Sequence, residues 1–384
     1  MDSQVLPPAP DPTSDPASAA HPHFAIGQPG TSLPVSAPPL RAPLGIRIFL
    51  SPSGLRAGWS VALFGIFYYL MLVLGGLIAF LFDRSLMDFH FTPGNALIAE
   101  AVPLFAILVA GYCLSLVERR TLLDYHLRSA RPISEFLWGA AAGFIAVSAL
   151  VAAMAAGGWL HLAHPSALGL SVVRSCMLWA AAFLFTGLFE EGSFRCYLQF
   201  TLTRGLNFWW ALAAQTFICV LTMLRTHSLG GYGVYAIVVL GLAPCLILHL
   251  RRASGSSFWQ AAWVTSAGFG AFHTGNSGET AVGIFAAAAI GFVFCVSIRL
   301  TGSAWWAIGC HAAWDWAETF FYGTANSGNM PQGSLFNSAP AGRLFMSGGT
   351  DGPEGSLLVI PALLLLLVLL FLFYAHKRPA PAAP

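Results

Sequence analysis

Charged side chains are scarce in this sequence of 384 residues. Asp, Glu, Lys and Arg make up 9% of it, whereas soluble domains usually contain about 25%. Hydrophobic residues make up 57%, which is more apolar surface than a soluble core could bury, so the expected solvent is a lipid bilayer. No basic patch indicates a nucleic-acid partner, and the formal net charge of +2 says nothing further about partners.

Paired cysteines and a cleavable leader are also missing. None of the seven cysteines belongs to a CxxC pair, and each is interpreted as a small buried hydrophobic side chain. They are Cys113, Cys176, Cys196, Cys219, Cys245, Cys295 and Cys310. The N-terminus is polar and rich in proline. No signal peptide is therefore expected, and the first apolar span is expected to direct the chain to the membrane.

Long apolar runs dominate the rest of the chain. Residues 1–45 are rich in Pro, Ala and Ser and are predicted to be a disordered tail. A spanning helix needs about 20 apolar residues, and backbone groups cannot remain unpaired in lipid. The sequence therefore predicts an all-α, polytopic transmembrane helical bundle of about 8–10 spans. The candidate segments are 58–82, 93–117, 136–159, 171–189, 208–224, 231–250, 258–274, 280–298, 303–322 and 355–375.

The distribution of basic residues predicts the orientation. Arginines and lysines precede the first segment and follow the second, sixth, eighth and last, while the intervening loops carry few. With ten spans these clusters fall on one side, which the positive-inside rule assigns to the cytoplasm. Both termini are then cytoplasmic, and the loop at 323–353 faces outward.

Ionisable residues inside apolar sequence are candidates for function, because burying charge in lipid is costly. Glu190 and Glu191 end a long apolar run. Glu191 and Arg195 are four residues apart on a helix, which favours an ion pair. Glu190 points about 100° away from that pair, so it lacks the partner and could serve as a general base. An equally weighted interpretation is a charge cluster that simply ends the span.

Two histidines follow on later segments. His273 lies near a helix end after several small residues, where a structural, hydrogen-bonded histidine is the more common interpretation. His311 and Asp315 share one helix face at i and i+4 and are expected to face a cavity. Glu318 continues that face, although a polar contact at the outer interface is slightly preferred for it. Isolated polar residues elsewhere in apolar sequence, Glu100 among them, are interpreted as structural. A proton-coupled transporter or a hydrolase could use such groups, and the spacing does not decide between them.

The order of these motifs resembles the CPBP family of intramembrane proteases, which includes the CAAX prenyl endopeptidases and bacteriocin-processing enzymes and is also called the Abi family. The matching residues are Glu190-Glu191-Gly-Ser-Phe-Arg195, Phe269-Gly-Ala-Phe-His273 and His311-Ala-Ala-Trp-Asp315. Members of the family commonly carry Asn at the last of these positions, where this sequence has Asp. The segment from Leu300 to His311 is also similar to the family's approach to its last motif.

The resemblance implies a mechanism. Glu190 would activate water for attack on a peptide carbonyl, and His273 and His311 would hold that water or polarise the carbonyl. Asp315 would orient His311 or contact the oxyanion, while Glu191 and Arg195 would brace the helix. Glu190, His273 and His311 could together bind a catalytic Zn²⁺. No HExxH pair is present, and the family has been described both as metalloproteases and as metal-free glutamate proteases.

Composition, the apolar runs and the resemblance together predict a domain organisation. The tail at 1–45 would precede N-terminal transmembrane helices at 46–170, a catalytic core at 171–322, the loop at 323–353 and a C-terminal helix and tail at 354–384. The first two motifs are farther apart than in typical members, so 208–257 is interpreted as an inserted helical pair.

The motifs must also meet at one depth in the bilayer. A helix running to about 203 would place Glu190 at mid-depth. Alternatively, the helix of His273 continues past Gly275.

The sequence therefore predicts an integral, multi-pass protein, expected in a bacterial cytoplasmic membrane, with the bilayer and a peptide or protein substrate as its partners. The predicted activity is that of an intramembrane endopeptidase that cleaves a membrane-associated substrate. The alternative is a non-proteolytic protein of the same fold that acts as a scaffold, immunity factor or regulator. A transporter is the less favoured third class.

Overall fold

The computed structural model describes residues 43–51, 54–82, 90–163, 169–225, 231–276 and 278–374. The predicted disordered tail at 1–45 lies almost wholly outside these residues. The chain divides into two units, 1–46 and 47–384, and the helical bundle belongs to the second. Two short strands, β1 (Leu50–Ser51) and β2 (Gly54–Leu55), form an antiparallel pair immediately before the bundle.

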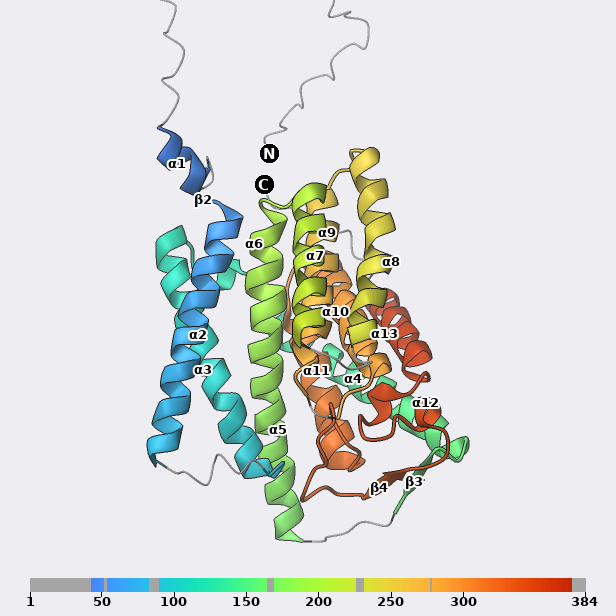
Figure 1. Cartoon of the computed structure of the whole chain (residues 1–384). Helices are drawn as coiled ribbons and strands as arrows, with labels where there is room; N and C mark the ends of the chain where they lie inside the picture. The colour runs from blue at the N-terminus through green and yellow to red at the C-terminus, as the bar shows by residue number, and fades with distance from the viewer. Residues whose placement is uncertain are drawn as a thin grey trace, which may run out of the picture. The chain divides into compact units, whose positions relative to one another are not determined.

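Helices account for nearly all of the bundle, which confirms the predicted all-α class. Every one of the ten predicted segments coincides with a helix (Figure 1). These helices are α2 (Ala57–Phe82), α3 (Pro93–Glu118), α4 (Pro132–Ala156), α5 (Leu170–Glu191), α7 (Phe208–Arg225), α8 (Gly231–Leu250), α9 (Ser256–His273), α10 (Ala281–Thr301), α11 (Trp305–Trp316) and α13 (Val359–Tyr374). The short helices are α1 (Leu44–Phe49), η2 (Leu122–Asp124), α6 (Gln199–Thr203), α12 (Leu344–Ser347) and η5 (Pro353–Gly355).

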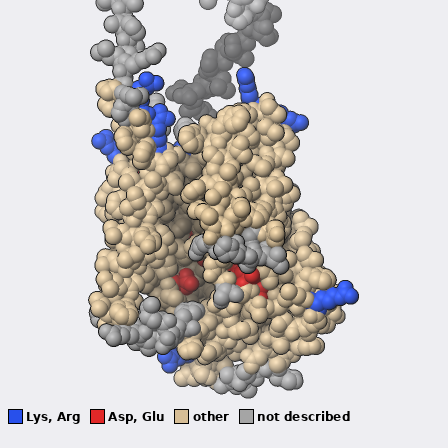
Figure 2. All heavy atoms as spheres, viewed as in Figure 1, with Lys and Arg blue, Asp and Glu red and all other residues tan. Residues whose placement is uncertain are grey.

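Six helical segments in the described residues are long and apolar enough to cross a membrane. They make the chain an integral, multi-pass membrane protein. The six are Ala57–Leu81, Pro93–Glu118, Pro132–Ala156, Leu170–Thr203, Tyr232–Leu250 and Ala281–Thr301, and two shorter apolar helices cover Phe208–Leu224 and Val359–Leu372. Figure 2 shows Lys and Arg mainly around the start of α2 and the α8–α9 loop, with others at the opposite end of the bundle.

One helix is much longer than its neighbours. α5 continues without a break through a π-helical segment, η3 (Gly192–Leu198), into α6, which gives a span of 34 residues (Figure 1). At about 1.5 Å per residue such a helix exceeds the roughly 30 Å of a hydrocarbon core. Glu190 and Glu191 therefore lie inside the span and not at its end, as the prediction of a helix running to 203 required. No pattern in the sequence indicates η3, although π-helical turns are frequent at functional sites.

The helix of His311 is held by an unusually close crossing. Gly139 and Gly143 on α4 face the backbone of Trp306 and Cys310 on α11, where a Cβ atom would overlap the carbonyl oxygens. Gly309 faces the α4 backbone in the same way from the other side. Small residues allow two helix axes to approach, and here they fix the position of α11 in the bundle.

Residues 208–225 and 231–250 form two adjacent helices, α7 and α8, that pack against α9 and α10. Val234 and Ile237 of α8 share a buried cluster with Ala267 of α9 and with Ile284 and Ala288 of α10. The predicted helical pair is therefore present, while its origin as an insertion stays a prediction.

The segment after α11 is a folded structure. A second π-helical turn, η4 (Ala317–Phe321), ends this span. Strand β4 (Ser338–Pro340) then pairs antiparallel with β3 (Leu160–Leu162), which follows α4. Two glycines with positive φ allow close approaches: Gly352 (φ 104°) packs on the carbonyl of Ala325, and Gly328 (φ 83°) packs on Gly278 between α9 and α10. We call residues 323–358 the outer loop, after the side on which the orientation predicted from the basic residues would place them. Composition predicted that 323–353 is a loop, but not this folded arrangement.

Candidate active site

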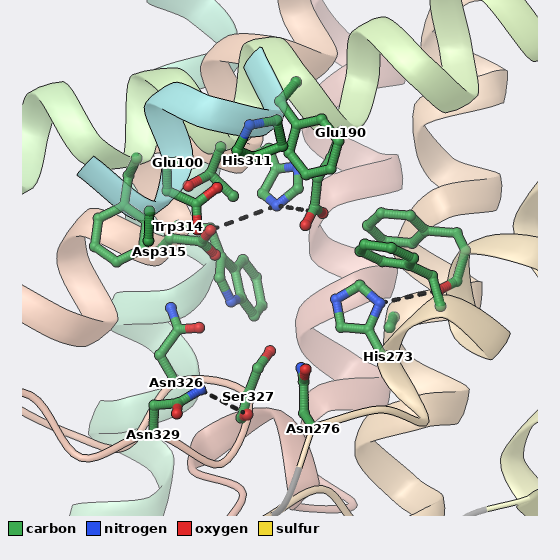
Figure 3. A pocket seen from close by; sticks show the side chains of 18 of the residues that line it. Glu100, Glu190, His273, Asn276, His311, Trp314, Asp315, Asn326, Ser327 and Asn329 are labelled. Atoms are coloured by element: carbon green, nitrogen blue, oxygen red, sulfur yellow. Dashed lines mark hydrogen bonds and ion pairs between the residues drawn. The ribbon is translucent and has the colours of Figure 1, made fainter. Parts of the chain in front are cut away.

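A cavity of about 590 Å³, open to the surface, lies within the bundle. Four of the six predicted site residues line it, namely Glu190 from α5, His273 from α9, and His311 and Asp315 from α11 (Figure 3). The three motifs, which are far apart in the sequence, are therefore brought together at one cavity. Figure 2 shows acidic atoms in a hollow of the surface, with no Lys or Arg atoms beside them.

The other two predicted residues, Glu191 and Arg195, form a fully buried layer behind the cavity wall. The Arg195 Nε atom lies 3.2 Å from Glu191 Oε2, as the i and i+4 spacing predicted. The other carboxylate oxygen of Glu191 accepts a hydrogen bond from His311 Nδ1 at 2.8 Å. Nδ1 therefore carries the ring proton of His311, and Nε2 is the nitrogen that remains on the cavity side. Glu191 thus orients His311, a contact that spacing along one helix could not predict.

Arg195 is enclosed by aromatic rings. Its guanidinium carbon lies 4.2 Å from the ring centroid of Phe269, 5.5 Å from that of Phe294 and 5.7 Å from that of Phe194. The guanidinium also passes over Gly291 of α10, where a Cβ atom would overlap it. Cation–π contacts strengthen when water is excluded. They stabilise a charge that has Glu191 as its one carboxylate partner among the described residues.

Glu190 has a partner on another helix, although none was expected from its own. Its Oε2 atom lies 3.7 Å from His311 Nε2, and the same nitrogen lies 3.4 Å from Asp315 Oδ2. Glu190 Oε2 is buried and accepts no hydrogen bond from the described residues. One imidazole nitrogen therefore faces two carboxylates, and the Glu190 carboxylate keeps the capacity to accept a proton.

His273 faces the same cavity across from Glu190 and His311 (Figure 3). Its Nδ1 atom donates a hydrogen bond of 2.9 Å to the carbonyl oxygen of Phe269, one turn earlier. Nε2 is thus left as an acceptor. Helix α9 ends at His273, so the alternative in which this helix continues past Gly275 is wrong. The motifs meet through the long α5–α6 helix instead.

The residues predicted to hold zinc are chemically suitable, since two imidazoles and one carboxylate are common zinc ligands. Zinc requires bonds of about 2.0–2.2 Å, so its ligand atoms must converge. Among the described residues, the one group of three His, Cys, Asp or Glu side chains whose ligand atoms lie within 4.8 Å of one another is Asp315, Glu318 and Glu354. Glu190, His273 and His311 would have to draw closer to share an ion, and zinc at this site stays a prediction.

Sequence reasoning missed several residues of the site. Glu100 of α3 was interpreted as structural but lines the cavity. Glu318 was assigned to the outer interface but is fully buried beside Asp315 and Glu354. Asn326 and Glu354 of the outer loop also line the cavity. A lone acid without a helical partner was the available signal for Glu100, while nothing in the loop composition indicated which loop residues fold inward.

The outer loop brings further carboxyl groups out of water. Burial, with the neighbouring charges of Asp315 and Asp351, raises the pKa of Glu354 to about 8. Burial also raises the pKa of Asp351 to about 6, even though the amide and hydroxyl of Thr280 donate to its carboxylate at 3.0 and 2.7 Å. Glu354, which lines the cavity beside Asp315, therefore gives it an acidic wall whose charge changes over the physiological pH range, while Asp351 does not line the cavity.

Comparisons with known proteins agree with the motifs. Residues 245–317 match the family model described as Type II CAAX prenyl endopeptidase Rce1-like. That stretch includes the motifs of His273 and His311, and the match confirms the predicted resemblance to CPBP-type CAAX proteases. The Glu190-Glu191 motif lies outside it. Neither the curated proteins nor the solved structures include a match to this chain.

Proposed function

We propose that this chain is an intramembrane endopeptidase that hydrolyses a peptide bond of a membrane-associated protein or peptide with a water molecule activated by Glu190. One observation carries the proposal. Three groups border one cavity beside the 34-residue span. They are the carboxylate of Glu190, which has a buried oxygen without a hydrogen bond, the imidazole of His311, which Glu191 orients, and the imidazole of His273. The family match, which describes a type of peptidase, supports the same reaction class.

In the proposed reaction, Glu190 takes a proton from a cavity water as the water oxygen attacks the carbonyl carbon of the substrate. A tetrahedral intermediate forms and its carbonyl oxygen becomes negative. The carbon–nitrogen bond then breaks, and the proton held by Glu190 passes to the leaving amine, directly or through His311 Nε2 at 3.7 Å. His273 Nε2 accepts a hydrogen bond from the attacking water across the cavity. Glu191 keeps His311 in the required tautomer throughout.

A zinc ion held by Glu190, His273 and His311 would polarise the carbonyl and lower the pKa of the bound water. The family description makes a prenylated CAAX sequence the first substrate to examine. Cytoplasmic orientation of the termini and location in a bacterial cytoplasmic membrane remain part of the proposal.

The test uses the full chain in proteoliposomes with an internally quenched peptide that ends in a farnesylated CAAX sequence. We expect Glu190→Gln to lower kcat by about 10³-fold or more, since it removes the proton acceptor. The matched control is Glu118→Gln, the same substitution at a buried glutamate that does not line the cavity. Mass spectrometry identifies the cleaved bond.

Full turnover by folded Glu190→Gln protein would contradict the proposed role of Glu190, whereas a lack of cleavage by folded wild type would leave the non-proteolytic alternative. To separate the metal and metal-free versions, bound metal is quantified in wild type and in His273→Ala and His311→Ala. Loss of a stoichiometric metal in both variants would favour the metal version.

A further inference from the structure

We propose that Asn326 is a catalytic residue of this site and that its side-chain Nδ2 group donates a hydrogen bond to the substrate carbonyl oxygen, which carries the negative charge in the tetrahedral intermediate. The inference rests on the proposed endopeptidase function. It adds a residue from the outer loop, outside all three sequence motifs and outside the region matched by the family model.

Asn326 differs from the other asparagines of the cavity in that its amide Nδ2 atom lacks an acceptor among the described residues. Three asparagines line the cavity, and Figure 3 shows all of them on its outer-loop side. Asn276 Nδ2 donates to Glu279 Oε1 at 2.9 Å, and Asn329 Nδ2 donates to the Ser327 carbonyl at 3.2 Å. Asn326 is 8% exposed, and its Nδ2 atom is buried without an acceptor among the described residues. A buried donor without an acceptor is unfavourable unless a ligand supplies one.

The carboxylates and imidazoles around the reacting centre offer few hydrogen-bond donors to a substrate carbonyl. A peptide carbonyl can only accept hydrogen bonds, whereas the groups around His311 are mainly acceptors themselves. The carboxylates of Glu190 and Asp315 cannot donate when ionised, and His311 Nε2 faces both of them. His273 has its ring proton on Nδ1, engaged with its own helix. The developing oxyanion therefore needs a donor from elsewhere.

A second buried donor lies on this wall. The indole Nε1 of Trp314 has no hydrogen-bond partner among the described residues, although the indole lies near the carboxyl group of Glu354. In Figure 3 the amide of Asn326 points toward the end of α11 that bears Trp314 and Asp315. Its Nδ2 group thus lies on the wall that also carries Asp315, with no competing acceptor among the described residues.

Backbone hydrogen bonds hold Asn326 in place. The backbone of Asn326 exchanges two hydrogen bonds with Asn329, at 3.0 and 2.9 Å. Between them, Gly328 packs on Gly278 and donates to the Asp351 carbonyl at 3.2 Å. The side chain of Asp351 is in turn held by Thr280 at the start of α10. Asn326 is therefore positioned by backbone contacts that do not depend on its side chain, which is the preorganisation that oxyanion donors require.

The experiment measures steady-state cleavage of the farnesylated quenched peptide by the full chain in proteoliposomes. We expect Asn326→Ala and the isosteric Asn326→Asp to lower kcat on the order of 10²-fold, with KM within about 3-fold, as for loss of one oxyanion donor. The matched control is Asn276→Ala, which removes an asparagine amide from the same cavity that already has an acceptor. It is expected to change kcat by less than about 3-fold.

A second variant separates donation from a merely structural role. Asp315→Asn places an amide on the same wall, so the double variant Asp315→Asn/Asn326→Ala should regain about 10-fold in kcat over Asn326→Ala. A binding measurement complements turnover. A peptide aldehyde, whose hydrate resembles the tetrahedral intermediate, should bind Asn326→Ala about 10-fold more weakly than wild type, whereas the matching alcohol should bind both equally.

Several outcomes would overturn the inference: unchanged kcat in Asn326→Ala, an effect confined to KM, a loss equal to that of Asn276→Ala, no rescue by Asp315→Asn, or equal weakening of aldehyde and alcohol binding. If wild type cleaves through Glu190 while Asn326→Ala is fully active, the inference alone fails. If Glu190→Gln cleaves as fast as wild type, or wild type neither cleaves nor binds the peptides, the proposed function fails and the inference fails with it.

Discussion

The molecule buries glutamates in two polar networks that are built in opposite ways. Glu118, at the last residue of α3, has a side chain that is 1% exposed. Arg204 approaches it at 2.8 Å and Arg120 at 3.7 Å, and the hydroxyls of Tyr125 and Tyr197 donate to it at 3.3 and 3.4 Å. At the cavity, by contrast, Glu190, Glu191 and Asp315 share one arginine and one histidine.

The difference separates a structural network from one that awaits a ligand. Around Glu118 the cations and hydroxyls exceed the acids, so every oxygen is satisfied and no cavity is needed. Around Glu190 the acids exceed the cations and a buried oxygen lacks a donor. Burial of unpaired charge is unfavourable, so such an imbalance persists where chemistry requires it.

Breaking the ion pair behind the cavity should have the largest effect on stability. Arg195→Met removes the cation and leaves Glu191 buried with His311 as its one remaining partner among the described residues, which is expected to lower the free energy of unfolding by about 3–5 kcal/mol. Chemical unfolding in detergent micelles, followed by circular dichroism, measures this loss. The control is Glu191→Gln/Arg195→Met, which removes both charges and should recover part of it. Equal stability of Arg195→Met and wild type would show that the pair does not hold the bundle.

Removing the charge of Glu118 from its own network should lower the free energy of unfolding by less. Glu118→Gln leaves two arginines whose side chains are 32% and 17% exposed, so both can turn toward water. We expect a loss of about 1–2 kcal/mol in the same unfolding measurement. A loss as large as that of Arg195→Met would remove the distinction between the two networks.

The acidic wall should produce the smallest effect, a pH dependence. Glu354 has a pKa of about 8 in the folded chain and about 4.3 when unfolded, so the folded state binds the extra proton between these values. Its contribution to stability is therefore complete below about pH 4 and is lost as the pH rises through about 8. Glu354→Gln should have a flatter Tm profile between pH 5 and pH 8.5 than wild type. A Glu354→Gln profile as steep as that of wild type would assign the dependence to other groups.

Much of the fold could be predicted, because apolar runs directly report membrane helices. The predicted segment 93–117 coincides with α3 and 231–250 with α8. The ion pair of Glu191 and Arg195 was also predictable, since both residues lie on one helix. Both features follow from the 3.6-residue periodicity of an α-helix, which acts between residues close in the sequence.

The remainder depends on contacts between distant segments. The hydrogen bond from His311 to Glu191 joins residues that are 120 positions apart, and no pattern in either helix encodes it. Glu100 and Asn326 lack a helical-spacing signal and reach the cavity only through the packing of α3 and of the outer loop. Composition predicted a loop at 323–353, but the approach of Gly328 to Gly278 decides which of its side chains face the cavity.

The π-helical turn η3 has a consequence for how the chain tolerates change in length. Such a turn can be regarded as one residue inserted into an α-helix, and here it separates Glu190 and Glu191 from Gln199. Gln199 is fully buried and reaches Phe258 and Thr265 of α9. A change in length that this turn does not absorb would rotate the helix beyond it by about 100° per residue, turning Gln199 away from α9. The register of this helix therefore links the reacting acids to α9, the helix that carries His273.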